Sequence, residues 1–112
     1  KSLLKKVLKS VFIQCFRMDR LKIDKEEMHH PFKHVIIDKK KKVWLIDFER
    51  CHKSKDPKNV TQFSSYIISS FIKETLKKKG IKVSKLKVIA AAKKYREKIS
   101  KVNMEKIVVC MK

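Results

Sequence analysis

The sequence predicts a single α+β domain that is mostly helical, with one short β-hairpin packed among about four helices. Apolar residues recur at the spacing of an amphipathic helix over four stretches of the chain. Only two short runs, 35–37 and 43–48, have the dense apolar pattern of buried strands. A length of 112 residues supports one hydrophobic core, so residues 1–112 are expected to form one domain.

The first helix is expected to begin near Leu3 and to end near Met18. Its apolar residues recur three and four positions apart, with lysines between them. They are Leu3, Leu4, Val7, Leu8, Val11, Phe12, Cys15 and Phe16. Residues 19–33 lack this periodicity and include Pro31, so we expect a long loop there.

The two strand-like runs flank four lysines, 39–42, which are typical of a solvated hairpin turn. Both runs are apolar on both faces, so we expect helices on either side of the hairpin. If Asp38 lies opposite Val43, counting outward from the turn places His34 opposite Asp47. Opposite side chains of antiparallel strands lie about 4.5–5.5 Å apart, which would bring an imidazole and a carboxylate together. On spacing alone, such a pair is more often a structural ion pair than a metal site, and a register slip of one residue would separate the two.

The second half of the chain is expected to be helical. A polar loop, 50–60, leads to a helix from Thr61 to Gly80, where the glycine fits a C-terminal cap. Ser84 can cap a third helix, and Asn103 can begin a fourth. The aromatic residues at apolar positions of these helices favour core packing over base stacking. These are Phe12, Phe16, Phe63 and Phe71.

The formal net charge of +20 arises from 27 lysines and 4 arginines against 11 acidic residues. Two origins are equally compatible with it: the lysine-rich proteome of a hyperthermophile, or affinity for nucleic acid or another polyanion. A surface that binds phosphates usually contains more arginine. The positive charge alone makes non-specific nucleic-acid binding that weakens with salt an expected property. The sequence contains no recognised nucleic-acid motif.

Three cysteines, Cys15, Cys51 and Cys110, are widely spaced and form no CxxC pair. We expect buried thiols in a reducing compartment, which implies the cytoplasm. The apolar runs are too short to span a bilayer, so no membrane is expected as a partner. The chain opens on Lys1, which suggests an excised segment or the C-terminal part of a longer protein.

The segment "RLKIDKEEM…PFKHVII…KVWLIDFER" resembles the catalytic segment of protein kinases and of their RIO-like and small archaeal relatives. In that family a loop leads to an asparagine before one strand, and a second strand ends in Asp-Phe-Gly. The version here looks most similar to a group of predicted archaeal serine/threonine kinases, which have Pro-x-Lys-His before the first strand and Asp-Phe-Glu after the second. The resemblance covers about residues 11–66 and implies a protein-kinase-like C-lobe.

The resemblance implies a role for four residues. Asp47 looks like the magnesium-binding aspartate, and His34 lies where the asparagine that binds a second metal would be. Glu27 falls at the catalytic carboxylate that orients the attacking hydroxyl and accepts its proton. Lys33 is a candidate phosphate contact. The implied cofactors are ATP and Mg²⁺ or Mn²⁺, and Mn²⁺ tolerates a histidine nitrogen better.

The chain also departs from the family pattern. Lys25 replaces the usual loop histidine, Glu49 replaces a glycine, and Gly80 is the only glycine. The glycine-rich loop of the N-lobe is absent, so an N-lobe would be supplied in cis or in trans. An inactive pseudokinase scaffold or a basic nucleic-acid-binding module are the alternatives to an active kinase. The protein substrate is undefined, and an exposed apolar face could lead to homo-oligomers.

A third alternative is a small metal site formed by His30, His34, Cys51 and His52, with His29 nearby. The spacing matches no established zinc motif, and the sequence favours loop residues, with Cys51 packed under the second strand.

Overall fold

A computed structural model describes residues 2–31 and 34–111, and it shows the expected mostly helical α+β domain. The described part contains five helices and four short strands, with one more helix than the sequence predicts. In chain order they are α1 (Ser2–Arg20), β1 (Ile23–Asp24), β2 (Val35–Ile37), β3 (Val43–Leu45), β4 (His52–Lys53), α2 (Asn59–Ile68), α3 (Ser70–Lys78), α4 (Lys85–Glu97) and α5 (Lys101–Val108).

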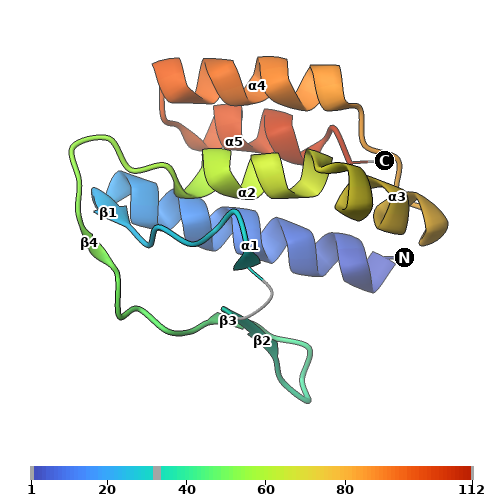
Figure 1. Ribbon diagram of the computed structural model, residues 1–112, viewed down its shortest axis with the longest axis horizontal. Helices are drawn as coiled ribbons and strands as arrows, with labels where there is room; N and C mark the ends of the chain where they lie inside the picture. Colours follow the sequence, from blue (N-terminus) through green and yellow to red (C-terminus); the bar gives the residue numbers. More distant parts are fainter. Residues whose placement is uncertain (1, 32–33, 112) are drawn as a thin grey trace.

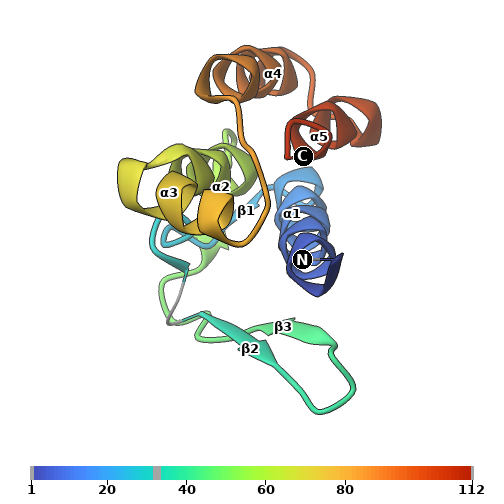
Figure 2. The same cartoon turned by 90° about the vertical axis from the view of Figure 1, so that its right-hand side faces the viewer.

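Helix α1 lies at the centre of the molecule. Helices α2 and α5 pack against it, and α4 covers both of them from the far side (Figures 1 and 2). The apolar positions predicted for α1 face this core, where Phe12 and Cys15 are fully buried. The ring of Phe12 meets that of Phe63 edge to face, with centroids 4.8 Å apart. Within the described residues, no helix is both long and apolar enough to cross a membrane.

The single helix expected over 61–80 is wrong, because the chain forms two helices that meet at Ser69. Ser69 has an extended ψ of 146°, and its hydroxyl donates to the carbonyl oxygen of Tyr66 at 2.7 Å. A serine hydroxyl that bonds the preceding turn competes with the helical backbone. The change of direction leaves Phe71 79% exposed, so its predicted place in the core is also wrong.

The helix caps follow the sequence signals closely. Gly80 has φ 86°, its N–H donates to the carbonyl of Lys77, and the N–H of Ile81 donates to that of Leu76. This is the Schellman arrangement in which glycine is favoured. Ser84 caps α4 as expected, with its hydroxyl accepting from the N–H of Lys87. Helix α5 is capped by Ser100 and therefore begins before the expected Asn103.

The β2–β3 hairpin has a register one residue different from the prediction. Val35 pairs with Leu45, Ile36 with Trp44 and Ile37 with Val43. The difference arises at the turn, where the N–H of Asp38 donates to the carbonyl of Lys42, so the turn holds three lysines rather than four.

The hairpin does not lie between helices, contrary to expectation. Its inner face packs on α1 through Val43, while the remainder projects below the helices (Figure 2). Three apolar side chains of the hairpin and two that follow β3 are exposed: Ile36, Ile37, Trp44, Ile46 and Phe48.

The loop expected over 19–33 contains strand β1, which pairs with β4 to form a second ribbon. Ile23 pairs with Lys53 and Asp24 with His52. The buried carboxylate of Asp19, at the end of α1, accepts hydrogen bonds from the backbone N–H groups of Asn59 and Val60. Asp19 thereby caps α2 and ties the loop region to the helical core.

Candidate functional site

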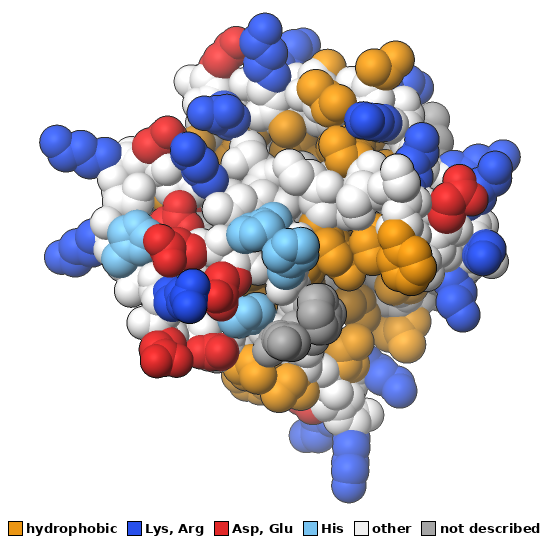
Figure 3. Space-filling model, viewed as in Figure 1, with side chains coloured by type: hydrophobic (Ala, Val, Ile, Leu, Met, Phe, Trp, Pro, Cys, Tyr) orange, Lys and Arg blue, Asp and Glu red, His pale blue; other side chains and the backbone are white. Residues whose placement is uncertain are grey.

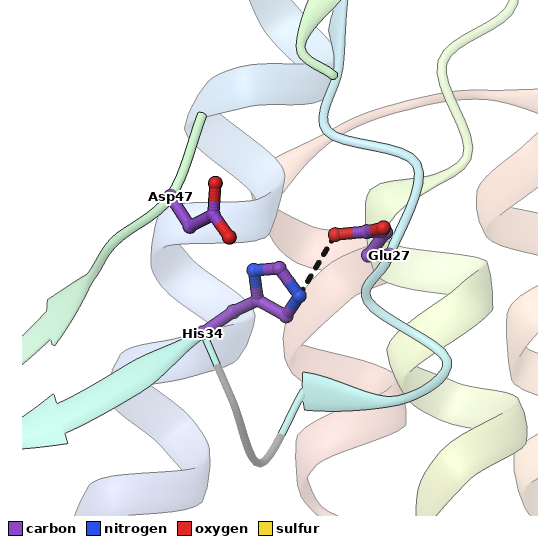
Figure 4. A group of neighbouring side chains, drawn as sticks. All are labelled: Glu27, His34 and Asp47. Atoms are coloured by element: carbon purple, nitrogen blue, oxygen red, sulfur yellow. Dashed lines mark ion pairs between the residues drawn. The ribbon is translucent and has the colours of Figure 1, made fainter. Parts of the chain in front are cut away.

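Three side chains from three separate segments converge beside the helical core (Figure 4). Glu27 comes from the loop after β1, His34 immediately precedes β2, and Asp47 follows β3. One potential ligand atom from each lies within 4.8 Å of the others. These are the residues that the kinase resemblance singles out as base and metal ligands. Glu27 and Asp47 lie 20 positions apart in the sequence.

His34 and Asp47 meet by a different geometry from the predicted cross-strand pair. The carbonyl of His34 accepts from the N–H of Ile46 at 2.9 Å, so Asp47 lies one residue beyond the pairing. Asp47 has φ 61°, in the left-handed region that costs a non-glycine residue about 1–2 kcal/mol. This turn in the backbone, rather than the strand register, places Asp47 beside His34. Unfavourable backbone conformations of this kind concentrate at functional sites.

His34 is buried and contacts a different group through each ring nitrogen. Nε2 lies 2.8 Å from Oε2 of Glu27, and Nδ1 lies 2.8 Å from Nζ of Lys25. The other carboxylate oxygen of Glu27 lies 3.6 Å from Nε of Arg50, which is largely exposed. The imidazole thus connects a buried ammonium to a carboxylate that faces a pocket.

Lys25 also belongs to this cluster, although sequence reasoning did not assign it to the site. Its side chain is 1% exposed, and Nζ donates to the backbone oxygen of Asp47 at 2.8 Å in addition to contacting His34. The same nitrogen lies 5.0 Å from the ring centroid of Phe48, within cation–π range. One sequence signal was available, since Lys25 occupies the place of the loop histidine in the kinase-like pattern.

The backbone on either side of Lys25 is held by buried polar groups. Oδ1 of Asn59 accepts from the N–H of Lys25, and Nδ2 of Asn59 donates to both Asp19 and the carbonyl of Ile23. Asp24 accepts from the N–H of Glu26, which has φ 74°. The loop that carries Lys25 and Glu27 is therefore fixed to the start of α2.

Burial is the main influence on the Lys25 ammonium and lowers its pKa. The carboxylates of Asp47 and Glu27 act in the opposite direction and favour the charged form. Lys25 therefore supplies this site with a buried ammonium that lies among acceptor groups.

A pocket of about 760 Å³ opens over Glu27 and His34. It is lined by Glu26, Glu27, His29, His30, His34, Arg50 and Gln62. A second hollow of about 620 Å³ shares His29 and His30 with it and is otherwise more apolar, with Tyr66, Phe71 and Ile72 among its lining residues. Figure 3 shows acidic and histidine side chains gathered on this face beside an apolar area.

Two further sequence-based expectations concern this region. Lys33, the candidate phosphate contact, lies outside the described residues. The alternative metal set of His30, His34, Cys51 and His52 is not the group that converges: His52 instead lies 3.7 Å from Glu26, and among the described residues only Glu27, His34 and Asp47 form a metal-competent group. Of the three thiols, Cys15 is buried, while Cys51 and Cys110 are partly exposed.

A scan against protein-family models and searches of curated proteins and of solved structures found no match to this chain.

Proposed function

We propose that this chain is the catalytic-loop half of an atypical, RIO-like serine/threonine protein kinase, with a protein-kinase-like C-lobe that binds a divalent metal and ATP phosphates. The observation that carries the proposal is the convergence of Glu27, His34 and Asp47 within 4.8 Å, beside a pocket that Glu27 and His34 line. The segments that resemble the kinase catalytic loop and metal-binding strand are separate in sequence, and these are the segments that meet.

The donor set fits a hard divalent cation. The Asp47 carboxylate offers oxygen ligands, which Mg²⁺ prefers, and Mg²⁺ is commonly held by one or two carboxylates together with substrate phosphates and water. Asp47 is exposed and can contact a bound ion, and a divalent ion held there would offset the charge of the ATP phosphates.

Glu27 is assigned as the residue that orients the acceptor hydroxyl and accepts its proton. Its carboxylate is held on one side by His34 and is 31% exposed toward the pocket. A positioned carboxylate of this kind contributes about 10²–10⁴-fold to proton transfer. Lys33 remains a proposed phosphate contact, and the glycine-rich nucleotide cradle would come from an N-lobe in cis or in trans.

Metal-dependent nucleotide binding tests the proposal. Titrating Mn²⁺ or Mg²⁺ with ATP into ¹⁵N-labelled protein should shift the backbone amides around Glu27, His34 and Asp47 at both moderate and high salt. Asp47→Asn should abolish these shifts, and asparagine tolerates the left-handed backbone of Asp47, so the fold is retained. Asp56→Asn, in an exposed loop, is the matched control. Unchanged binding by the Asp47 variant would exclude the assignment.

A second candidate function, non-specific polyanion binding, is favoured by an observation on the lysines. Within residues 2–31 and 34–111, every ion pair closer than 4.0 Å involves histidine or Arg50, and none joins a lysine to a carboxylate. Hyperthermophile proteins typically use lysine in ion-pair networks with glutamate, but this chain has only six glutamates for 27 lysines. Uncompensated lysines attract phosphate polymers. RNA binding that falls steeply with salt and ignores Asp47→Asn would support this function, and salt-independent binding would contradict it.

A further inference from the structure

The contacts of Lys25 and His34 determine which atoms of the site are free to bind a metal. An ammonium group has donors and no acceptor, so Nδ1 of His34, 2.8 Å from Nζ of Lys25, must be the acceptor of that hydrogen bond. A neutral imidazole with an accepting Nδ1 carries its proton on Nε2. That nitrogen lies 2.8 Å from Oε2 of Glu27, and it therefore donates to the carboxylate.

In this arrangement neither nitrogen of His34 has a lone pair to offer. Nδ1 is occupied by Lys25, and Nε2 is protonated toward Glu27. A metal ligand histidine needs an unprotonated nitrogen that faces the ion. The oxygen atoms of the site, by contrast, remain available, since the Asp47 carboxylate is exposed to solvent.

We propose that Lys25 is the positioning residue of this site: it fixes His34 as a hydrogen-bond bridge to Glu27 instead of a metal ligand, and it leaves oxygen alone to bind the divalent ion. Its second hydrogen bond, to the backbone oxygen of Asp47, holds the left-handed turn that presents the Asp47 carboxylate. The proposal rests on the proposed function for the presence of a metal, but the tautomer of His34 is independent of it.

The inference also concerns metal selectivity. A site with a histidine nitrogen favours softer ions such as Zn²⁺, whereas an oxygen-only site favours Mg²⁺. Lys25 would thus make a site that contains a histidine behave as a magnesium site. The substitution of histidine for the family's asparagine then changes how Glu27 is held, not which ion is bound.

The first experiment measures the His34 tautomer without any metal. Long-range ¹H–¹⁵N spectra of the ring nitrogens should show a single Nε2–H tautomer, assigned by its absence in His34→Gln. In Lys25→Met, a side chain of similar length without a donor, Glu27 still holds the proton on Nε2, but Nδ1 loses its hydrogen bond, so the ¹⁵N resonance of Nδ1 should move to that of a free ring nitrogen. Lys25→Arg, which retains donors, should restore the wild-type pattern, and Lys22→Met, an exposed neighbour in the same loop, should leave it unchanged. An Nδ1–H tautomer in the wild-type protein would overturn the proposal.

The second experiment uses Mn²⁺ alone as the probe. Electron spin-echo spectra of the bound ion should show no ¹⁴N coupling in the wild-type protein, whereas Lys25→Met should introduce coupling and raise affinity for Zn²⁺ relative to Mg²⁺ by about tenfold. Wild-type ¹⁴N coupling that disappears in His34→Gln would overturn the proposal. If Mn²⁺ does not bind at all, the metal part of the proposed function fails, and the tautomer measurement still decides the role of Lys25.

Discussion

The phenolic oxygen of Tyr95 donates a 2.6 Å hydrogen bond to Oδ2 of Asp19, joining two buried residues that are 76 positions apart in the chain. Burial raises the pKa of the Asp19 carboxyl, and the hydrogen bonds from Tyr95 and Asn59 oppose that shift. Burial also raises the pKa of Tyr95, with the Asp19 carboxylate adding to the effect. This junction connects α1, α2 and α4 and supports the loop that carries Lys25.

Asp19→Ala should destabilise the domain by about 3 kcal/mol. The substitution removes the acceptor for Tyr95, for the Asn59 side chain and for two N–H groups at the start of α2, and buried donors without partners are costly. Urea denaturation followed by circular dichroism measures the change. Asp56→Ala, at an exposed carboxylate, should stay within about 0.5 kcal/mol of wild type. A loss below about 1 kcal/mol in the Asp19 variant would contradict this account.

The hairpin should lose stability on the acid side through Asp38. Hydrogen bonds from Trp44 Nε1 and from the N–H of Lys42 lower the pKa of the Asp38 carboxyl. A carboxyl with a depressed folded-state pKa stabilises the fold above its unfolded pKa of about 3.9, and the stabilisation is lost as pH falls through the lower folded value. Because Trp44 is the only tryptophan, its fluorescence should report this step with a midpoint below about 3.9. Asp38→Asn should remove the step, and a midpoint above 3.9 in wild type would show that the hydrogen bonds are not formed.

Glu27→Gln should lower phosphoryl transfer by about 100-fold or more when an N-lobe is present in cis or in trans, while metal–nucleotide binding is kept. The amide keeps the shape of the side chain but cannot accept the proton of the hydroxyl. Glu26→Gln is the matched control, since Glu26 lines the same pocket and, among the described residues, its ion pair is with His52. Equal rates for the two variants would remove Glu27 from the role of base.

Lys41→Gly should stabilise the hairpin by about 0.5 kcal/mol, because Lys41 has φ 66° and glycine adopts this region without a steric cost. Lys39→Gly in the same turn lacks a positive φ and should instead destabilise by about 0.5–1 kcal/mol. Urea denaturation monitored by Trp44 fluorescence compares the two. The reverse order would mean that the three-residue turn is not the one formed.

Phe63→Ala and Phe71→Ala should differ sharply although both residues belong to one apolar stripe in the sequence. Phe63 is 2% exposed and contacts Phe12, so its loss should cost about 3–5 kcal/mol. Phe71 is exposed, and its replacement should change stability by less than about 0.5 kcal/mol. Thermal unfolding of the two variants measures the difference. A large cost at Phe71 would indicate that α2 and α3 form one continuous helix in solution.

The sequence by itself determined the helices and their ends where the signal is local. The spacing of apolar residues defines α1, and the cap at Gly80 needs only the φ freedom of glycine and its two neighbouring hydrogen bonds. The positions of strands β2 and β3 also follow from local composition, although the exact turn between them does not. Such features depend on residues within one or two turns of each other.

Only the tertiary structure decided the hairpin register, the break at Ser69 and the role of Lys25. A strand register depends on one backbone hydrogen bond at the turn, and the helix break depends on one serine hydroxyl, so neither is marked by composition. Lys25 is one of 27 lysines, and only its place at the loop histidine of the kinase-like pattern sets it apart in the sequence. Its environment arises because α1, α2 and both ribbons enclose it, and a buried ammonium must find acceptors wherever the fold provides them, here on Asp47 and His34.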